Sequence, residues 1–237
     1  MRSLIPALVA TLITGSSLAQ EPETEAEKPA PRNRGVEVCF FAVALHPDAG
    51  KIVALSGDAR GPAFTLPLHN LTQPQFVKTR EIALIPANAP ADKPLPPIAK
   101  IKLPDQGNAF RILLVPIAKT ITYQPIIVRG DDPDFGEGSV FFVNLGTEEI
   151  LGNIGSETLK LASGSRKFLT LEGARENAFF DVRFAIRKGE AITPLSDTRW
   201  PVLKRTRAYV LFYNDPAGKT TYRAVDEFIP PKQPAAP

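Results

Sequence analysis

The residues whose types and spacing come nearest to a binding site are one tryptophan and four basic residues. Trp200, the only tryptophan among 237 residues, is preceded by Arg199 and followed by Lys204, Arg205 and Arg207. An aromatic ring can stack on a sugar or a cation, and guanidinium groups bind carboxylates. The group therefore indicates a site for an acidic polysaccharide. The alternative is structural: Trp200 closes one end of a β-sandwich, and the charges keep an edge strand from pairing with other chains.

Side chains that could act in catalysis or bind a metal are few. The chain has one cysteine, Cys39, and two histidines, His46 and His69. A copper site of the sandwich type needs two histidines, a cysteine and usually a methionine, but the only methionine is Met1. No Gly-x-Ser-x-Gly motif marks a nucleophilic serine. We expect no catalytic residue, no metal centre and no cofactor, and therefore a protein that is not an enzyme.

Two further features have a structural interpretation and a chemical alternative. Cys39 lies in the apolar run 38–43, which predicts a buried, unreactive thiol. As the only cysteine, it can form no intrachain disulfide. The loop 131–137 contains Asp131, Asp132, Asp134 and Glu137, and clustered carboxylates can bind Ca²⁺. Phe135 interrupts the calcium-loop pattern, so we expect a solvated acidic turn, with calcium binding as the alternative.

The elements that must position these residues are strands. Short apolar runs separated by Gly, Ser, Asn and Pro recur along residues 36–229, which predicts about thirteen antiparallel strands. Residues 139–145 are apolar on both faces, as expected for a strand in the middle of a packed fold. Residues 180–186 alternate between apolar and charged, which predicts a strand with one face in water. The expected fold is all-β, an antiparallel sandwich of the immunoglobulin-like or a related type.

The two ends of the chain differ in composition from its middle. Residues 1–19 have a basic residue, an apolar stretch and a small-x-small site, which predicts a cleaved signal peptide. Residues 20–35 and 230–237 are rich in Pro, Ala and charge and are expected to be a disordered tether and tail. The sandwich domain is then 36–229. Its Pro-rich segment 86–97 is expected to be a loop, with a split into two subdomains as the alternative.

Charge and hydropathy restrict the partners. The 28 Lys and Arg residues nearly balance 25 Asp and Glu, which argues against nucleic acid as a partner. After signal cleavage no apolar run is long enough to span a membrane. The strand pattern, signal and Pro-rich tether resemble those of uncharacterised exported bacterial proteins with an immunoglobulin-like sandwich. The resemblance implies the fold and export, and it carries over no site residue.

The expected function is that of an exported, non-catalytic sandwich protein, secreted or periplasmic, which binds or scaffolds in the cell envelope. Its partner would be an envelope protein or a polysaccharide. The first alternative is a carbohydrate-binding module that uses Trp200 and its basic neighbours. The second is a hydrolase with a pair of carboxylates on a sheet face, which sequence spacing alone cannot reveal.

Overall fold

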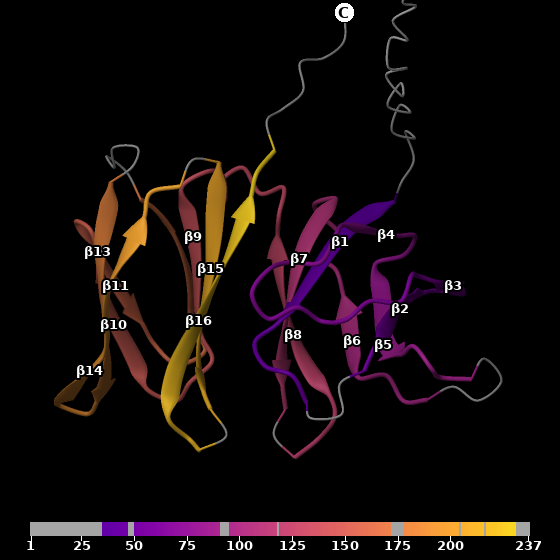
Figure 1. The fold of residues 1–237 in the computed structure, drawn as a ribbon, viewed down its shortest axis with the longest axis horizontal. Helices are drawn as coiled ribbons and strands as arrows, with labels where there is room; N and C mark the ends of the chain where they lie inside the picture. The colour runs from indigo at the N-terminus through magenta and orange to yellow at the C-terminus, as the bar shows by residue number, and fades with distance from the viewer. Residues whose placement is uncertain are drawn as a thin grey trace, which may run out of the picture. The chain divides into compact units, whose positions relative to one another are not determined.

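The part of the chain that the structure describes consists of strands and turns. The structure is a computed structural model and describes residues 35–46, 50–90, 95–117, 119–171, 178–203, 205–215 and 217–230. These ranges contain sixteen strands and no helix (Figure 1), which confirms the all-β prediction. They contain no helix of the length and hydropathy that crossing a membrane requires. The predicted signal lies outside the described residues, as do the tether except Gly35 and the tail except Pro230.

The first half of the described chain forms a sandwich of two four-stranded sheets, which we call sandwich 1. One sheet, the inner sheet, has the order β4-β1-β7-β8, and the other, the outer sheet, has the order β3-β2-β5-β6. All neighbours are antiparallel except β1 and β7, which are parallel. The strands are β1 (Val36–Ala42), β2 (Ile52–Ser56), β3 (Ala59–Arg60), β4 (Gln75–Val77), β5 (Glu81–Pro86), β6 (Ala99–Lys102), β7 (Ala109–Pro116) and β8 (Tyr123–Arg129).

The second half forms sandwich 2, again from two four-stranded sheets. Its inner sheet has the order β12-β9-β15-β16, and its outer sheet has the order β11-β10-β13-β14. Here β9 and β15 are the parallel pair. The strands are β9 (Ser139–Asn144), β10 (Glu149–Ile154), β11 (Glu157–Leu161), β12 (Arg166–Thr170), β13 (Phe179–Lys188), β14 (Ala191–Pro201), β15 (Thr206–Asn214) and β16 (Thr220–Phe228).

The two sandwiches have the same topology. Adding eight to each strand number of sandwich 1 gives the sheet orders of sandwich 2, and the single parallel pair of each sandwich falls at the matching place. Figure 1 shows the two inner sheets next to each other. The described chain is therefore a structural repeat of an eight-stranded unit. The Pro-rich segment 86–97 joins β5 to β6, which are paired neighbours in one sheet.

Apolar residues form one core inside each sandwich and a third between the inner sheets. Val140 and Phe142 of β9 face the core of sandwich 2, whereas Phe141 and Val143 face the third core. All six residues of β9 are buried, and residues 140–143 are apolar, as expected for a central strand with both faces covered. Phe41 of β1 supplies the third core from the side of sandwich 1.

The strand count and the fold type differ in detail from the prediction. The structure has sixteen strands rather than about thirteen, and two of them, β3 and β4, have only two and three residues. The apolar residues 63–66 form no strand and contribute only an isolated bridge from Phe64 to Ile52. The immunoglobulin-like part of the prediction is not confirmed. In each half, the first and second strands lie in different sheets, whereas the constant-type immunoglobulin fold has them in one.

Candidate ligand-binding site around Trp200

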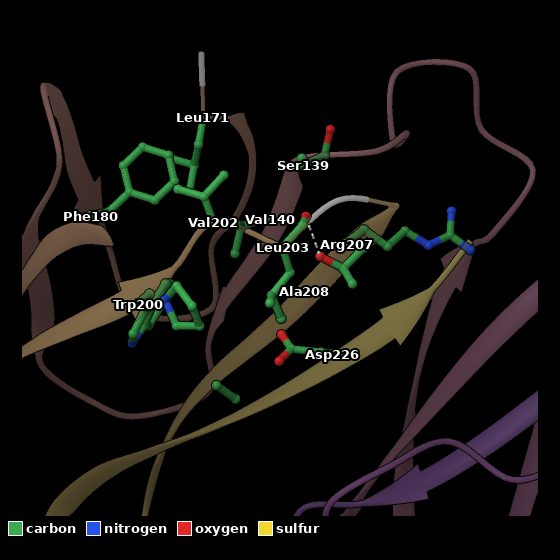
Figure 2. A pocket seen from close by; sticks show the side chains of 14 residues that line it. Ser139, Val140, Leu171, Phe180, Trp200, Val202, Leu203, Arg207, Ala208 and Asp226 are labelled. Carbon is green, nitrogen blue, oxygen red and sulfur yellow. Dashed lines mark hydrogen bonds between the residues drawn. The ribbon is translucent and has the colours of Figure 1, made fainter. Parts of the chain in front are cut away.

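A pocket of about 240 Å³ opens at one end of sandwich 2, between its two sheets (Figure 2). Trp200 lines it from the end of β14 and Phe180 from the start of β13, and these two residues are directly paired across the outer sheet. Ala208 of β15 and Asp226 of β16 line it from the inner sheet, where they too are paired. The pocket therefore has one wall from each sheet.

The outer-sheet wall is aromatic, and the inner-sheet wall is made of small side chains. Trp200 is half-buried, and its indole packs against the ring of Phe184, with 5.8 Å between ring centroids. Phe184 in turn contacts Phe212 and Tyr222, so the indole is held from behind by a packed aromatic cluster. The facing wall is formed by Val140, Thr206, Ala208 and Ala224. An aromatic face opposite small residues leaves a slot that can take a flat ring.

Asp226 provides a carboxylate in this largely apolar pocket. In Figure 2 its side chain points from β16 toward the side where Trp200 lies. Partial burial raises the pKa of Asp226 above its ordinary value. Within the described ranges no hydrogen bond or ion pair holds this carboxylate. It can therefore accept hydrogen bonds from a ligand.

Of the predicted site residues that the structure describes, Trp200 and part of Arg207 line the pocket, and Arg199 and Arg205 do not. Arg199 follows the alternation of β14 to the opposite face, where its Nε lies 2.9 Å from Oδ1 of Asp181. Arg205 is exposed in the turn before β15, and its backbone N–H donates to Glu137. Lys204 lies outside the described residues. The basic residues thus do not form a continuous strip beside the indole.

Arg207 has a structural role. Its guanidinium points away from Trp200 in Figure 2, toward the core between the two inner sheets. Arg207 Nε donates to Glu227 Oε2 at 2.7 Å, and Arg111 of sandwich 1 donates from Nε to Oε1 of the same carboxylate at 2.7 Å. Tyr209 donates its hydroxyl to Glu227, and Arg111 also pairs with Glu37. Sequence reasoning missed this buried cluster, although the alternation of β15 puts Arg207 on the same face as Tyr209.

The pocket can be compared with the same place in sandwich 1. The first rung of hairpin β7–β8 pairs Phe110 with Arg129, and the first rung of β15–β16 pairs Thr206 with Phe228. β1 pairs with β7, and β9 pairs with β15, in parallel. Matching these rungs therefore also aligns the Phe-x-Val motif that starts at Phe41 with the Phe-x-Val motif that starts at Phe141. The inner sheets can therefore be compared position by position.

At the matched positions, sandwich 1 has large apolar side chains that fill its core. Phe40, Phe110 and Ile112 are fully buried there, and Ile127 packs against them. Every one has a smaller or polar counterpart in sandwich 2. In order, the counterparts are Val140, Thr206, Ala208 and Asp226. The pocket exists because the side chains that close this end of sandwich 1 are replaced by smaller ones.

The other candidate groups lie elsewhere. Cys39 is buried between the inner sheets, where desolvation raises the pKa of its thiol to about 11. His46 contacts Thr122 and Tyr123, whereas His69 lies near Arg223. The described residues contain no group of three His, Cys, Asp or Glu side chains placed to hold a metal.

Three of the four carboxylates of the acidic loop are bound by different partners. Asp131 pairs with Arg129 and accepts the backbone N–H of Asn108, and Asp132 accepts the backbone N–H of Asp134. Glu137 accepts the N–H that precedes β15. They do not converge on a common point. A second pocket, of about 580 Å³, lies in sandwich 1 beside His46 and Tyr123, but the Trp200 pocket is the one that contains a predicted site residue.

In comparisons with known proteins, neither a protein-family model nor a curated protein matches the chain.

Proposed function

We propose that this chain is an exported, non-catalytic binding protein of the cell envelope, and that it binds a single sugar unit of a polysaccharide in the Trp200 pocket. The observation that supports a sugar is the slot between the indole and a wall of small side chains, at a place that sandwich 1 fills. A stacked aromatic ring recognises the apolar face of a pyranose. Export rests on the composition of residues 1–19.

The size of the pocket favours one ring over a long ligand. Drug-sized ligands occupy pockets of roughly 300–1,000 Å³, and this pocket holds about 240 Å³. It opens at the end of the sandwich, so the rest of a polymer can continue into solvent. Binding without catalysis is proposed because, among the described residues, the pocket is lined by one carboxylate, Asp226, whereas glycoside hydrolysis uses a pair. The neighbouring Arg207 and Glu227 are bound to each other behind the inner sheet.

The test uses the only tryptophan as its own reporter. The mature chain is titrated with monosaccharides and short oligosaccharides while the fluorescence of Trp200 is recorded, and retention on insoluble envelope polysaccharide is measured in parallel. We expect saturable changes in emission and retention on the polymer. Trp200→Leu should weaken retention by about tenfold or more, because the stacking surface is lost.

The matched control is Phe228→Leu, which removes an aromatic ring that is 61% exposed and outside the pocket. This variant should be retained like the unmodified chain. If no saccharide changes the emission and no polysaccharide retains the protein, the proposal is wrong. It is equally wrong if Trp200→Leu is retained as well as Phe228→Leu.

A further inference from the structure

Among the described residues, the unpaired charge in the pocket is negative, the reverse of what the basic residues around Trp200 suggested. The guanidinium groups of Arg199 and Arg207 are bound to Asp181 and Glu227, on the faces of their strands away from the pocket. The carboxylate that remains is Asp226. A ligand that fills the pocket therefore meets one anionic acceptor and an aromatic ring, which together attract a cation.

The packing of sandwich 2 does not account for a charged residue at position 226. Its counterpart in sandwich 1, Ile127, packs on the apolar core. Asp226 is solvent-exposed, yet the apolar walls beside it remove part of its hydration and raise its pKa, so a partner that donates hydrogen bonds would stabilise its charged form. Along the described chain no side chain supplies that partner. A ligand carrying a positive charge would supply it.

We propose that the pocket binds the protonated primary amine of an unacetylated amino sugar, with Asp226 accepting hydrogen bonds from the ammonium group and Trp200 stacking on the sugar ring. This inference rests on the proposed function, because it assigns the chemistry of the sugar in the same pocket. The ammonium group has three donors and needs an acceptor close to the ring. Asp226 and Trp200 line one pocket from opposite sheets and meet both needs.

The shape of the pocket decides between an amino sugar and an amine on a flexible chain. Trp200 and Phe180 form the aromatic wall of the pocket. The facing wall projects less into the pocket, because Ala208 stands at the position that Ile112 occupies in sandwich 1. A rigid ring fills such a slot without losing the rotamer freedom that an alkylamine or a lysine side chain would lose. We therefore assign the amine to a ring.

The experiment titrates the fluorescence of Trp200 with five probes near neutral pH: glucosamine, glucose, N-acetylglucosamine, cyclohexylammonium and butylammonium. Glucosamine should bind at least about tenfold more tightly than glucose or N-acetylglucosamine, because a hydrogen bond to a charged group is the difference between them. Rising salt should reduce this preference, since part of the interaction is ionic and the carboxylate is near water. Cyclohexylammonium and butylammonium should bind more weakly than glucosamine.

Asp226→Asn is the variant that isolates the charge, because the amide has the size of the carboxylate and leaves the ring-stacking surface in place. It should abolish the preference for glucosamine over glucose. The matched control is Asp197→Asn on β14, which removes an exposed carboxylate that pairs with Arg183 away from the pocket. The control should keep the full preference. Circular dichroism establishes that both variants are folded.

Each other outcome overturns the inference in a distinguishable way. Equal binding of glucose and glucosamine, or a preference that survives Asp226→Asn, refutes the role of the charge and leaves a neutral sugar as the ligand. Tighter binding of butylammonium than of glucosamine refutes the ring and points to a lysine side chain. Binding of cyclohexylammonium without binding of any sugar refutes both this inference and the proposed function.

Discussion

Ile112 and Ala208 occupy matched positions in the two sandwiches. Replacing each by the residue found at the other tests whether the pocket is space that a large side chain fills in sandwich 1. Ile112 is fully buried in the core of sandwich 1, whereas Ala208 lines the pocket of sandwich 2. The two perturbations are Ile112→Ala, which should create a void where none exists, and Ala208→Ile, which should fill space that is already open. If the comparison is right, the two changes have opposite effects on stability.

The magnitudes follow from the surroundings of each residue. Ile112→Ala should lower the free energy of unfolding by about 2–5 kcal/mol, because the lost methylene groups are fully buried and leave a cavity. Ala208→Ile adds three carbon atoms, worth at most about 0.8 kcal/mol each when fully buried. Because the pocket is open at one side, we expect a gain of about 1 kcal/mol. In a closed core the same change would instead cost about 1–3 kcal/mol through overpacking.

The assay is urea denaturation of both variants, followed by far-ultraviolet circular dichroism, with retention on polysaccharide measured on the same samples. Ala208→Ile should be as stable as the unmodified chain or more stable, and it should no longer bind, since the isoleucine occupies the slot. A loss of more than about 1 kcal/mol on Ala208→Ile refutes the matching of the two sandwiches. Retention of full binding by a folded Ala208→Ile refutes the assignment of the site.

Three further predictions concern the core between the inner sheets. Glu227→Gln should lower the free energy of unfolding by about 3 kcal/mol, because the buried Arg207 loses its counter-charge and Arg111 keeps only Glu37. Asp197→Asn, which breaks an exposed pair, should cost less than about 1 kcal/mol, and similar losses for the two variants in urea denaturation would contradict this. Burial opposes ionisation of Glu227, but hydrogen bonds from Arg207 and Arg111 keep its pKa below the usual 4.5. The contribution of Glu227 to stability is therefore complete above pH 4.5 and is lost as the pH falls through the lower pKa of the folded state. Glu227→Gln should reduce this loss of stability in acid, and an unchanged acid dependence would contradict the prediction. Cys39 should resist iodoacetamide at mildly alkaline pH in the folded protein and react in urea, because its pKa is raised to about 11; rapid labelling of the folded chain, detected by mass spectrometry, would show that the thiol is accessible.

The all-β class was predictable because the apolar pattern that indicates a strand is complete within a few consecutive residues. Residues 140–143 of β9 are all apolar, and the run in β13 alternates, so burial on both faces or on one face follows directly from the local pattern. The repeat of the eight-stranded unit follows from the sheet orders rather than from the pattern of predicted strands. A comparison of Phe41-x-Val43-x-Leu45 with Phe141-x-Val143-x-Leu145 would have suggested it.

The candidate site was only half predictable from sequence. Trp200 stands out by type, but Asp226 does not, because it is distant in sequence and reaches the pocket only through the pairing of β15 with β16. Arg207 was grouped with Trp200 by its nearness in sequence. Alternation along β15 instead places it with Tyr209 on the face toward sandwich 1. Nearness along a chain predicts a site poorly in a β-protein, since neighbours point in opposite directions.

This alternation also explains why a binding pocket in sandwich 2 would need sandwich 1. Thr206, Ala208 and Asp226 face the pocket, and the residues between or next to them, Arg207 and Glu227, face the inner sheet of sandwich 1. Arg111 of sandwich 1 completes the buried cluster that holds β15 and β16 in register. Removing large side chains from one face of these strands weakens their hold on sandwich 2. The ionic cluster and the apolar contacts on the opposite face fix the same strands from behind, so the pocket can stay open without loosening its own wall.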